Sequence, residues 1–540
     1  MPGELHLGVD VGGTNTDAVI IDRQGTLIAK AKVATASDVR QATGQAIRLA
    51  LSRFGAGPDR IRRVMLGTTQ ATNAILERRG LQKVGVIRLG YPLTTALPPL
   101  ATWPADLRTA VSAGETVVAG GSDYDGAELG RLDRDAVARF ACSVAEAAEV
   151  IAITGVFSPV SAGQELEAAE IVRRELGDMN ICLSHEIGTL GLVERENATV
   201  LNAALTGVVT TITEALQDGL ARHGLHADTY LAQNDGTLVA LEAALRFPIL
   251  TIASGPANSM RGAAFLSGEE EAVVIDVGGT TADIGVLVRG FPSDSLSPVT
   301  VGGVETNFRM PDILSLRVGG GTRIEGRGST THFGTSVGSR LESEALVFGG
   351  SVPTLTDAAV ESGRMSLDGR TVPERWRPTL AAALGRADAL IAEGIDRMRL
   401  TSALWPLVVV GGAGTLVPSD VGGVSRFIRP GHYDVANAIG AAIAPVSGYA
   451  ERVCPSRPDR KTAAIQEACD DAFARAVQAG ADPRHVQIAD VDEVPLSYLL
   501  DPAVRVRVRA IGPLLDIPAT AFPAAPAVPA VPGGQIQPND

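Results

Sequence analysis

Apolar positions along the chain recur with two spacings, one typical of buried strands and the other of helices. Short uninterrupted apolar runs alternate with longer segments in which apolar residues lie three or four positions apart, as at Ala46, Ala50 and Phe54. This alternation predicts an α/β protein, with helices layered on sheets. The predicted strands are Val64–Leu66, Val84–Arg88, Val150–Thr154 and Leu407–Val410, and the predicted helices are Arg40–Phe54, Asn73–Arg79, Asp133–Ala148, Gln164–Leu176, Ala198–Ala221, Pro378–Arg399 and Asp434–Ile443.

One short pattern occurs twice. Residues 10–17 read Asp-Val-Gly-Gly-Thr-Asn-Thr-Asp and residues 276–283 read Asp-Val-Gly-Gly-Thr-Thr-Ala-Asp, so six of eight positions are identical. Each copy lies between two apolar runs, which predicts a strand, a glycine turn and a second strand. The repetition in matching contexts indicates a duplicated architecture.

The repeated turn has the residue types that bind a phosphate chain. Glycines let backbone N–H groups face an anion without a Cβ in the way, and hydroxyl side chains add donors. Asp10 and Asp276 end the first strand of each copy, where a carboxylate can hold Mg²⁺ beside phosphates. Neither the Walker pattern nor the GxGxxG pattern is present. The candidate nucleotide-binding residues of the two turns are Gly12, Gly13, Thr14, Asn15, Thr16, Gly278, Gly279, Thr280 and Thr281.

Other polar and glycine clusters are candidates with a structural alternative. Gly411, Gly412 and Gly414 follow an apolar run and suit close approach to a purine or ribose, or a plain strand-to-helix turn. Asp17 and Asp283 close the repeated pattern and are candidates either for chemistry or for bonding the backbone of their own turns. Four polar residues open a predicted helix and suit an anion or an amide substrate, or simple capping. These four are Thr68, Thr69, Thr72 and Asn73.

In their order along the chain, these motifs resemble those of the actin-like ATPase superfamily. More specifically, the chain resembles the hydantoinase/oxoprolinase family, the A-type subunits of ATP-dependent cyclic-amide hydrolases. A further loop, Gly319, Gly320 and Gly321, belongs to this resemblance as a nucleotide-binding candidate. The matching stretches are residues 8–17, 66–80, 193–203, 254–257, 276–283, 318–322 and 411–414.

The sequence departs from the family pattern in two places. A His usually precedes the Gly-Gly-Gly loop, whereas this chain has Leu314 and Arg317 in that stretch. The Glu-Tyr-Glu-Arg pattern common before the long helix appears as Leu192-Val-Glu-Arg195. These departures argue against carrying over a metal site from better-known members, and they indicate a subgroup with its own substrate or partner.

The resemblance implies an actin-like ATPase fold, which is a duplicated RNase H-like fold, with inserted α/β segments and a small C-terminal α+β segment. It implies ATP and Mg²⁺ as cofactors and phosphorylation of the carbonyl oxygen of a cyclic amide of the hydantoin, 5-oxoproline or lactam type. Asp10 and Asp276 become metal-positioning candidates, and either Asp276 or Asp283 could orient the attacking oxygen. Ring opening would need a B-type partner subunit, and an oligomer is expected. The alternatives are a carboxylase or small-molecule kinase subunit of the same fold, or a non-catalytic ATP switch like actin or Hsp70.

The expected domain organisation follows from these motifs. Residues 1–190 form an N-terminal family-type domain with the first turn, and residues 191–450 form a second actin-like half. Residues 455–511 change character, with a helix at Lys461–Ala479 and strands at Val486–Val494 and Val504–Ile511. Residues 512–540, rich in Pro and Ala, are expected to be a flexible tail.

Charge and cysteine usage exclude some classes of protein. The net charge of −14, from 47 basic and 61 acidic residues, is opposite to that of a general nucleic-acid binder. The four cysteines form no CxxC pair, which favours reduced thiols in a cytoplasmic protein. No secretory signal is recognised, and the uncharged stretch from Leu400 to Pro418 suits a buried strand and turn better than a membrane helix.

Three smaller features have mainly structural interpretations. His185 and Glu186 could form a metal or acid/base pair, although a lone His-Glu is usually structural. Residues 254–256, Ser-Gly-Pro, suggest a hinge turn between the halves. Three arginines alternate with valines near the C-terminus and are expected to line a solvated sheet face rather than a nucleic-acid stripe. They are Arg505, Arg507 and Arg509.

Overall fold

The computed structural model describes residues 5–35, 39–55, 57–188, 190–295, 299–308, 310–326, 330–496 and 502–514. The expected flexible tail lies outside these residues beyond position 514. Nine strands form the largest sheet, in the order β22-β23-β21-β10-β9-β4-β1-β2-β3. Their bounds are β1 Leu5–Val11, β2 Asn15–Asp22, β3 Leu27–Ala34, β4 Ile61–Thr68, β9 Asp228–Ala232, β10 Leu238–Ala240, β21 Val446–Pro455, β22 Gln487–Leu496 and β23 Ala503–Gly512.

A second sheet repeats the central topology of the first. In the first sheet β1 pairs antiparallel with β2, β2 antiparallel with β3, and β4 extends the sheet parallel to β1 and β9. In the second, β11 and β12 are the antiparallel hairpin, β13 continues it, and β19 and β20 extend it in parallel. The duplicated α/β architecture is therefore confirmed. The bounds are β11 Ala272–Val277, β12 Ala282–Val288, β13 Phe291–Pro292, β16 Ile313–Leu316, β19 Leu407–Val410 and β20 Phe427–Ile428.

The strands of both hairpins are buried on both faces, which is why they occur in the sequence as continuous apolar runs. Leu7 and Val9 pack with the helices α1 and α6 on one side of the first sheet. Val19 and Ile21 pack on the other side against α12. The helices concerned are α1 Val39–Phe54, α6 Leu192–Arg222, α8 Ser254–Ser267 and α12 Ala436–Ile443.

Helices α8 and α12 pack against each other between the two halves, with a glycine of each helix at the contact. α12 lies on β1, β2 and β4, whereas α8 lies on β11, β12 and β19. A Cβ added to Gly262 of α8 would overlap the carbonyl oxygen of Ala436, and one added to Gly440 of α12 would overlap that of Asn258. The glycines therefore allow the two helix backbones to touch, and they couple the halves closely.

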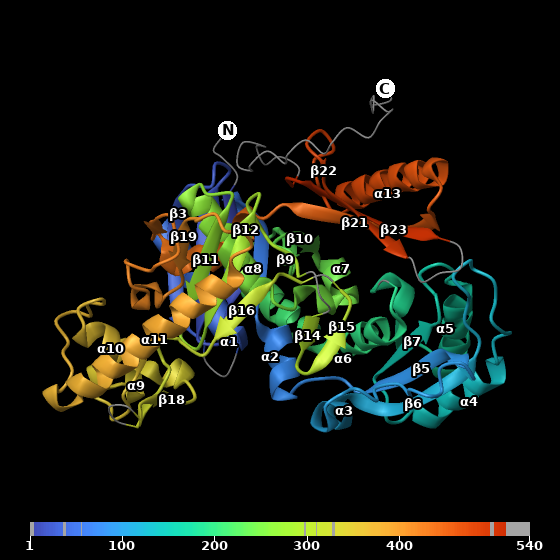
Figure 1. The fold of residues 1–540 in the computed structure, drawn as a ribbon, viewed down its shortest axis with the longest axis horizontal. Helices are drawn as coiled ribbons and strands as arrows, with labels where there is room; N and C mark the ends of the chain where they lie inside the picture. The colour runs from blue at the N-terminus through green and yellow to red at the C-terminus, as the bar shows by residue number, and fades with distance from the viewer. Residues whose placement is uncertain are drawn as a thin grey trace.

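Inserted between β4 and α6 is a separate, fully parallel sheet in the order β6-β5-β7-β8. In Figure 1 it lies at the lower right, beneath the C-terminal strands, while α10 and α11 project at the lower left. The sheet strands are β5 Val84–Tyr91, β6 Ser112–Ala119, β7 Val150–Gly155 and β8 Asn180–Leu183. The remaining elements are α2 Gln70–Glu77, α3 Ala105–Val111, α4 Arg134–Val144, α5 Gly163–Leu176, α7 Leu241–Arg246, α9 Leu341–Glu344, α10 Leu355–Glu361, α11 Arg377–Met398 and α13 Pro458–Gln478, with short strands β14 Val299–Val301, β15 Val304–Thr306, β17 Ile324–Glu325 and β18 His332–Phe333.

The C-terminal unit of β21, α13, β22 and β23 extends the first sheet, because β21 pairs with β10 at Leu238 and Val446. The prediction of a solvated arginine face on β23 is wrong at its last position. Arg509 is only 7% exposed, pairs with Asp490 and lies near Asp235 and the ring of Phe291. The two carboxylates offset the cost of burying this charge.

Some predicted boundaries and environments also shift. The helix expected to reach Ala148 ends at Val144, and the long helix α6 begins at Leu192, before the predicted start. α6 is long and apolar enough to cross a membrane by composition, but 67% of its apolar window is buried inside the molecule. Within the stretch from Leu400 to Pro418, residues 407–410 form the buried strand β19, as expected. The domain boundaries remain predictions.

Candidate functional site

The two glycine turns face each other across the junction of the halves. A Cβ built on Gly279 of the second turn would lie 2.9 Å from Cγ2 of Thr14 in the first. The carboxylates behind the turns are also close enough to influence each other, since Asp276 raises the pKa of Asp10. Two strand–turn–strand units from distant parts of the sequence thus form one site.

Backbone amides at the tips of these turns are available to a ligand. The N–H of Gly12 donates to Asn15 at 3.0 Å and that of Gly278 to Thr281 at 2.9 Å, which closes each turn internally. Among the described residues, no hydrogen-bond acceptor takes the amides of Gly13, Thr14, Gly279 and Thr280. Four amide donors on two facing turns form an arrangement that suits an anion. The side chain of Thr16, also predicted here, is buried and shares a hydrogen bond with Thr35.

Each hairpin places two carboxylates directly opposite one another. Asp10 is the register partner of Asp17, and Asp276 is that of Asp283. Burial, followed by the charges of Asp17 and Asp276, raises the pKa of Asp10 to about 7. Burial raises the pKa of Asp283 to about 6 and also raises the pKa values of Asp17 and Asp276. A site with this excess of buried acid favours a bound cation.

Side chains from α12 and α8, the helices between the halves, donate hydrogen bonds to the carboxylates of Asp10 and Asp276. Nδ2 of Asn437, on α12, donates to Oδ2 of Asp10 at 2.7 Å. Oγ of Ser259, on α8, donates to Oδ2 of Asp276 at 2.5 Å. The side chain of Asn258 is fully buried without a hydrogen-bond partner among the described residues, and its Nδ2 lies beside Gly67, as does Oδ1 of Asp10. These three polar residues could not be predicted from the sequence, because no motif in the neighbouring sequence distinguishes them from ordinary helix residues.

Lys32 supplies a positive charge that the sequence also did not reveal. Its Nζ lies 2.6 Å from Oδ1 of Asp17, and its side chain is one-third exposed. A Cβ on Gly412, from the opposite half, would lie 4.0 Å from this ammonium. The lysine is therefore at the boundary between the halves, where it can contact a phosphate as well as Asp17.

The third glycine turn belongs to the same site, although its glycines differ in role. Gly411 has a φ of 89°, and a Cβ there would overlap Oδ1 of Asp276, so only glycine fits. Gly412 is open towards Lys32, whereas Gly414 donates to Gly411 and packs beside Tyr433. The turn thus supports the second hairpin and leaves Gly412 facing the junction.

The Gly-Gly-Gly loop lies directly against the second hairpin turn. The amides of Gly320 and Gly321 donate to the carbonyls of Gly278 and Gly279 at 3.0 and 2.7 Å. The amide of Gly319 donates to Oγ1 of Thr322 at 2.9 Å. These three amides are already used, so the loop can influence a ligand only through the position of the second turn.

The four predicted substrate residues lie beside the first turn, at the start of α2. Thr68 accepts from the amide of Gln70, and Thr72 accepts from that of Ala253. Asn73 and Thr69 are 3.5 Å apart through Nδ2 and Oγ1, and Nδ2 of Asn73 lies 3.6 Å from a Cβ built on Gly13. Thr68 and Thr72 thus have structural partners, and the pair Thr69 and Asn73 is the part nearest the glycine turn.

Two other candidates lie away from this site or form different elements. Nδ1 of His185 pairs with Glu165 at 2.6 Å and Glu186 pairs with Arg246, so these neighbours do not form a pair with each other. The Ser-Gly-Pro stretch begins the helix α8 instead of forming a free turn, and Oγ of Ser254 donates to the carbonyl of Thr68.

The residues present fit Mg²⁺ with a triphosphate better than a metal held by protein ligands alone. The described residues contain no group of three or more His, Cys, Asp and Glu side chains that could hold an ion. Asp10 and Asp276 supply two carboxylates, one with an unpartnered Oδ1. Mg²⁺ is usually bound by one or two carboxylates together with water and substrate phosphates.

The chain is similar to known proteins over most of its length. Residues 6–176 match the hydantoinase/oxoprolinase N-terminal region, and residues 195–368 match the hydantoinase/oxoprolinase domain. The chain is 26% identical to the caprolactamase subunit alpha of Pseudomonas jessenii over 435 residues, covering 75% of this chain and 61% of that protein. It is 25% identical to the acetophenone carboxylase gamma subunit of Aromatoleum aromaticum over 438 residues, covering 72% and 59%. The chain thus spans about three-fifths of the length of these relatives.

Two solved structures share the fold over nearly the whole chain. The ATP-dependent caprolactamase from Pseudomonas jessenii has a TM-score of 0.73 at 18% identity, covering 95% of this chain and 88% of that one. Nucleotide-free acetone carboxylase has a TM-score of 0.71 at 16% identity, covering 96% and 89%. The fold is of the actin-like ATPase type, and the chain belongs to the hydantoinase/oxoprolinase family.

Proposed function

We propose that this chain is the ATP-binding subunit of an ATP-dependent cyclic-amide hydrolase. The observation that carries the proposal is the pair of facing glycine turns with four available amides, and with the buried Asp10 behind the first turn and the partly buried Asp276 behind the second. The amides and Lys32 would bind the phosphates, while Asp10 and Asp276 would hold Mg²⁺. When bound, Mg²⁺ would neutralise charge that develops on the transferred phosphoryl group.

Amide activation explains why ATP is needed. The carbonyl carbon of an unstrained cyclic amide is a poor electrophile, because the ring nitrogen donates electron density to it. Transfer of the γ-phosphoryl group from ATP to the carbonyl oxygen gives an imidate phosphate and ADP. Water then attacks the carbon and the ring nitrogen leaves as the amine, which gives an acyl phosphate. A second water attacks the same carbon and releases phosphate, and the product is a linear amino acid. We assign binding of the amide to Thr69 and Asn73, because they lie beside the first turn, and Asp283 is a candidate for orienting the attacking oxygen.

A partner subunit belongs to this proposal. The relatives are named as an alpha and a gamma subunit, which supports a partner subunit for this chain as well. We propose that a B-type subunit completes the ring opening in the cytoplasm. The hydantoin, 5-oxoproline and lactam types all remain candidate substrates.

A carboxylase subunit is the second candidate, because one relative is an acetophenone carboxylase subunit at almost the same identity. In that case the phosphoryl acceptor would be bicarbonate or an enol in place of an amide. The same facing turns would serve both reactions, so the acceptor is what distinguishes them. A non-catalytic ATP switch would have no small-molecule acceptor at all.

Phosphate release from ATP tests the proposal. The protein with its co-expressed partner should release phosphate faster with at least one compound from a panel of hydantoins, 5-oxoproline and lactams. Stimulation by a ketone with bicarbonate, but by no cyclic amide, would favour the carboxylase. Asp276→Ala should abolish turnover while the fold stays intact, and the exposed Asp178→Ala is the matched control. Turnover near the wild-type rate in Asp276→Ala would show that the site is misassigned.

A further inference from the structure

A buried side chain beside the glycine turns has no partner for either of its polar atoms. Asn258, on α8, is 0% exposed, and its Oδ1 and Nδ2 both lack a hydrogen-bond partner among the described residues. Nearly all buried amides in folded proteins are hydrogen-bonded, because an unsatisfied amide lowers the stability of the fold. Asparagine is also a poorer helix former than leucine, which has a similar size. Packing alone therefore does not explain an asparagine at this position, and a functional partner is expected.

The amide of Asn258 faces the carboxylate of Asp10. A Cβ built on Gly67 of β4 would lie 2.4 Å from Nδ2 of Asn258 and also 2.4 Å from Oδ1 of Asp10, so the two atoms are at most about 5 Å apart. Within the described part of the chain, this Oδ1 is likewise buried without a hydrogen-bond partner. An N–H donor and a carboxylate acceptor at this separation can form a hydrogen bond after a small rotation of the side chain.

Asn258 approaches this carboxylate from the opposite half of the molecule. Its helix α8 lies on β11, β12 and β19 of the second sheet, whereas Asp10 belongs to β1 of the first. The hydrogen bonds already formed stay within one half, because Asn437 of α12 donates to Asp10 and Ser259 of α8 donates to Asp276. A hydrogen bond from Asn258 would therefore join the second half to the leading carboxylate of the first.

The backbone of Asn258 is held at the contact between α8 and α12. A Cβ added to Gly440 of α12 would lie 1.9 Å from the carbonyl oxygen of Asn258, so the two helices touch there. Asn437, whose Nδ2 lies 2.7 Å from Oδ2 of Asp10, precedes Gly440 by about one helical turn. The same helix contact thus positions both amides beside Asp10. Rotation of the Asn258 side chain is enough to give the second oxygen a donor.

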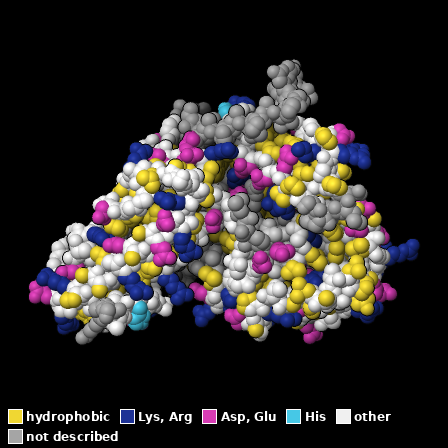
Figure 2. Space-filling view, in the orientation of Figure 1, with side chains coloured by type: hydrophobic (Ala, Val, Ile, Leu, Met, Phe, Trp, Pro, Cys, Tyr) yellow, Lys and Arg dark blue, Asp and Glu magenta, His cyan; other side chains and the backbone are white. Residues whose placement is uncertain are grey.

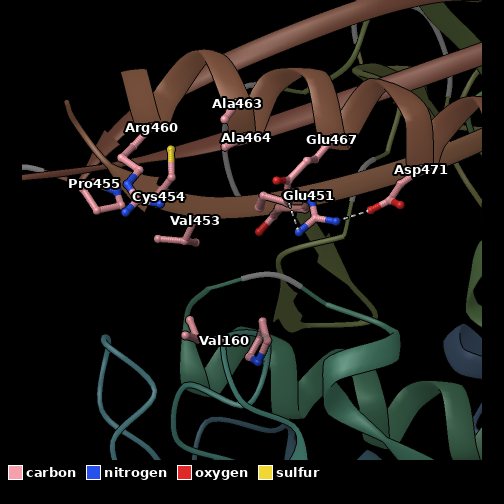
Figure 3. Close-up of a pocket in the computed structure, with 12 residues that line it drawn as sticks. Val160, Glu451, Val453, Cys454, Pro455, Arg460, Ala463, Ala464, Glu467 and Asp471 are labelled. Atoms are coloured by element: carbon pink, nitrogen blue, oxygen red, sulfur yellow. Dashed lines mark hydrogen bonds and ion pairs between the residues drawn. The ribbon is translucent and has the colours of Figure 1, made fainter. Parts of the chain in front are cut away.

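The cleft between the inserted sheet and the C-terminal unit does not supply the partner of Asn258. Figure 3 shows Val160 on one side of this cleft and α13 on the other. The described residues that line it come from the loop after β7, from β21 and from α13, whereas Asn258 faces β1 and β4. Asp10 is therefore the group that the amide of Asn258 can serve.

We propose that Asn258 is a positioning residue for the nucleotide-bound Mg²⁺, and that its amide donates to Oδ1 of Asp10 when this carboxylate holds the cation. Asn437 and Asn258 then fix the two oxygens, and each oxygen keeps a lone pair for the cation or for its water. Residues that orient metal ligands typically contribute 10–100-fold to metal affinity. The inference rests on the proposed function only in assigning Mg²⁺ to Asp10, and it is independent of the substrate.

The Mg²⁺ dependence of nucleotide binding tests this role in the full chain without any cyclic amide. Binding of a fluorescent ADP analogue would be measured in EDTA and across a Mg²⁺ titration. Asn258→Leu should raise the Mg²⁺ concentration for half-maximal binding at least tenfold, while the affinity in EDTA stays within twofold of wild type. Asn258→Ala, which adds no bulk at the helix contact, should show the same shift. A merely structural role would weaken binding equally with and without Mg²⁺.

A second buried asparagine provides the matched control. Asn202, on α6, uses both atoms of its amide, since Nδ2 donates to the carbonyl of Arg246 and Oδ1 accepts from the amide of Ile249. Asn202→Leu should therefore unfold at a lower temperature than Asn258→Leu, which breaks no hydrogen bond, and it should keep the wild-type Mg²⁺ dependence.

The inference and the metal site can fail separately. Wild-type Mg²⁺ dependence in both Asn258 variants, together with its loss in Asp10→Asn, would overturn the role of Asn258 and leave the metal site standing. An equal loss of ADP binding in EDTA and in Mg²⁺ would also overturn that role. Wild-type Mg²⁺ dependence in Asp10→Asn would refute the proposed metal site and, with it, the role of Asn258.

Discussion

Replacing Asp10 by Asn should stabilise the nucleotide-free protein while abolishing its ATP turnover. Asp10 is 2% exposed, and burial with two neighbouring carboxylates raises its pKa from 3.8 to about 7. A carboxyl group whose pKa is raised on folding costs stability above that pKa, and the cost disappears below the unfolded value. Stability of the wild-type protein should therefore fall as the pH rises from 4 to 7. The Asp10→Asn variant should not lose this part of its stability, because asparagine does not ionise.

The size of the effect follows from the same shift. Each pKa unit corresponds to about 1.4 kcal/mol, so the shift of roughly three units sets an upper value of about 4 kcal/mol, and relaxation around the site reduces this to about 2–4 kcal/mol. The new amide fits, because its oxygen can accept from Asn437 and its N–H₂ group can donate to Oδ1 of Asn258 once that unpartnered amide turns over to present its oxygen.

Thermal unfolding in EDTA without nucleotide measures this gain. At pH 8 the unfolding midpoint of Asp10→Asn should exceed the wild-type midpoint by roughly 2–4 °C, and the difference should vanish near pH 4. Glu170→Gln, an exposed substitution on α5, should show no pH-dependent difference. Equal or lower stability of Asp10→Asn at pH 8 would refute the inference that Asp10 is held at an energetic cost for ligand binding.

Three further substitutions probe the site and its support. Gly411→Ala should reduce ATP turnover at least tenfold, because the added Cβ overlaps the carboxylate behind the second turn, as a coupled phosphate-release assay would show. Lys32→Gln should weaken ATP binding about tenfold in calorimetry, since a charge-assisted hydrogen bond contributes roughly 1.5–3 kcal/mol. Arg88→Ala should destabilise the protein by about 3–5 kcal/mol in urea unfolding, because Glu196 would be left buried without its partner at 2.6 Å.

Each of these has a control elsewhere in the chain. Gly385→Ala, on an exposed position of α11 with open space around it, should keep full turnover. Lys30→Gln removes an ammonium from the same strand, where it pairs with Asp434, and should bind ATP more tightly than Lys32→Gln. Arg134→Ala breaks an exposed pair with Glu167 and should cost less than about 1 kcal/mol. Indistinguishable effects within any pair would contradict the assigned role.

The duplicated hairpins could be predicted from the sequence because they are local. Asp10 and Asp276 occupy equivalent positions in two separate hairpins, each with the same turn sequence between two apolar strands. The repeated sequence pattern therefore predicted both hairpins of the structure. The distribution of charge on the molecular surface gives less information about the site than the repeated hairpin sequence does. The face in Figure 2 carries acidic and basic side chains interspersed, without one continuous patch that would mark a binding site.

The residues that complete the site could not be predicted, because long-range packing brings them there. Asn437 reaches Asp10 across 427 positions, and Ser259 reaches Asp276 from a helix whose sequence is unremarkable. The same applies to Arg509, which becomes buried only because β23 joins the first sheet next to the second half. The sequence pattern of a strand or helix predicts where that element lies and which of its residues are buried. It does not predict which residues from distant parts of the chain will contact them.

The destination of the carbonyl oxygen tests the central claim most directly. A cyclic amide that stimulates turnover would be labelled with ¹⁸O at its carbonyl and incubated with ATP, the chain and its partner, and the released phosphate analysed by mass spectrometry. Phosphorylation of the carbonyl oxygen predicts one ¹⁸O atom in the inorganic phosphate for each ring opened. Unlabelled phosphate, with all of the ¹⁸O retained in the carboxylate of the product, would contradict the account.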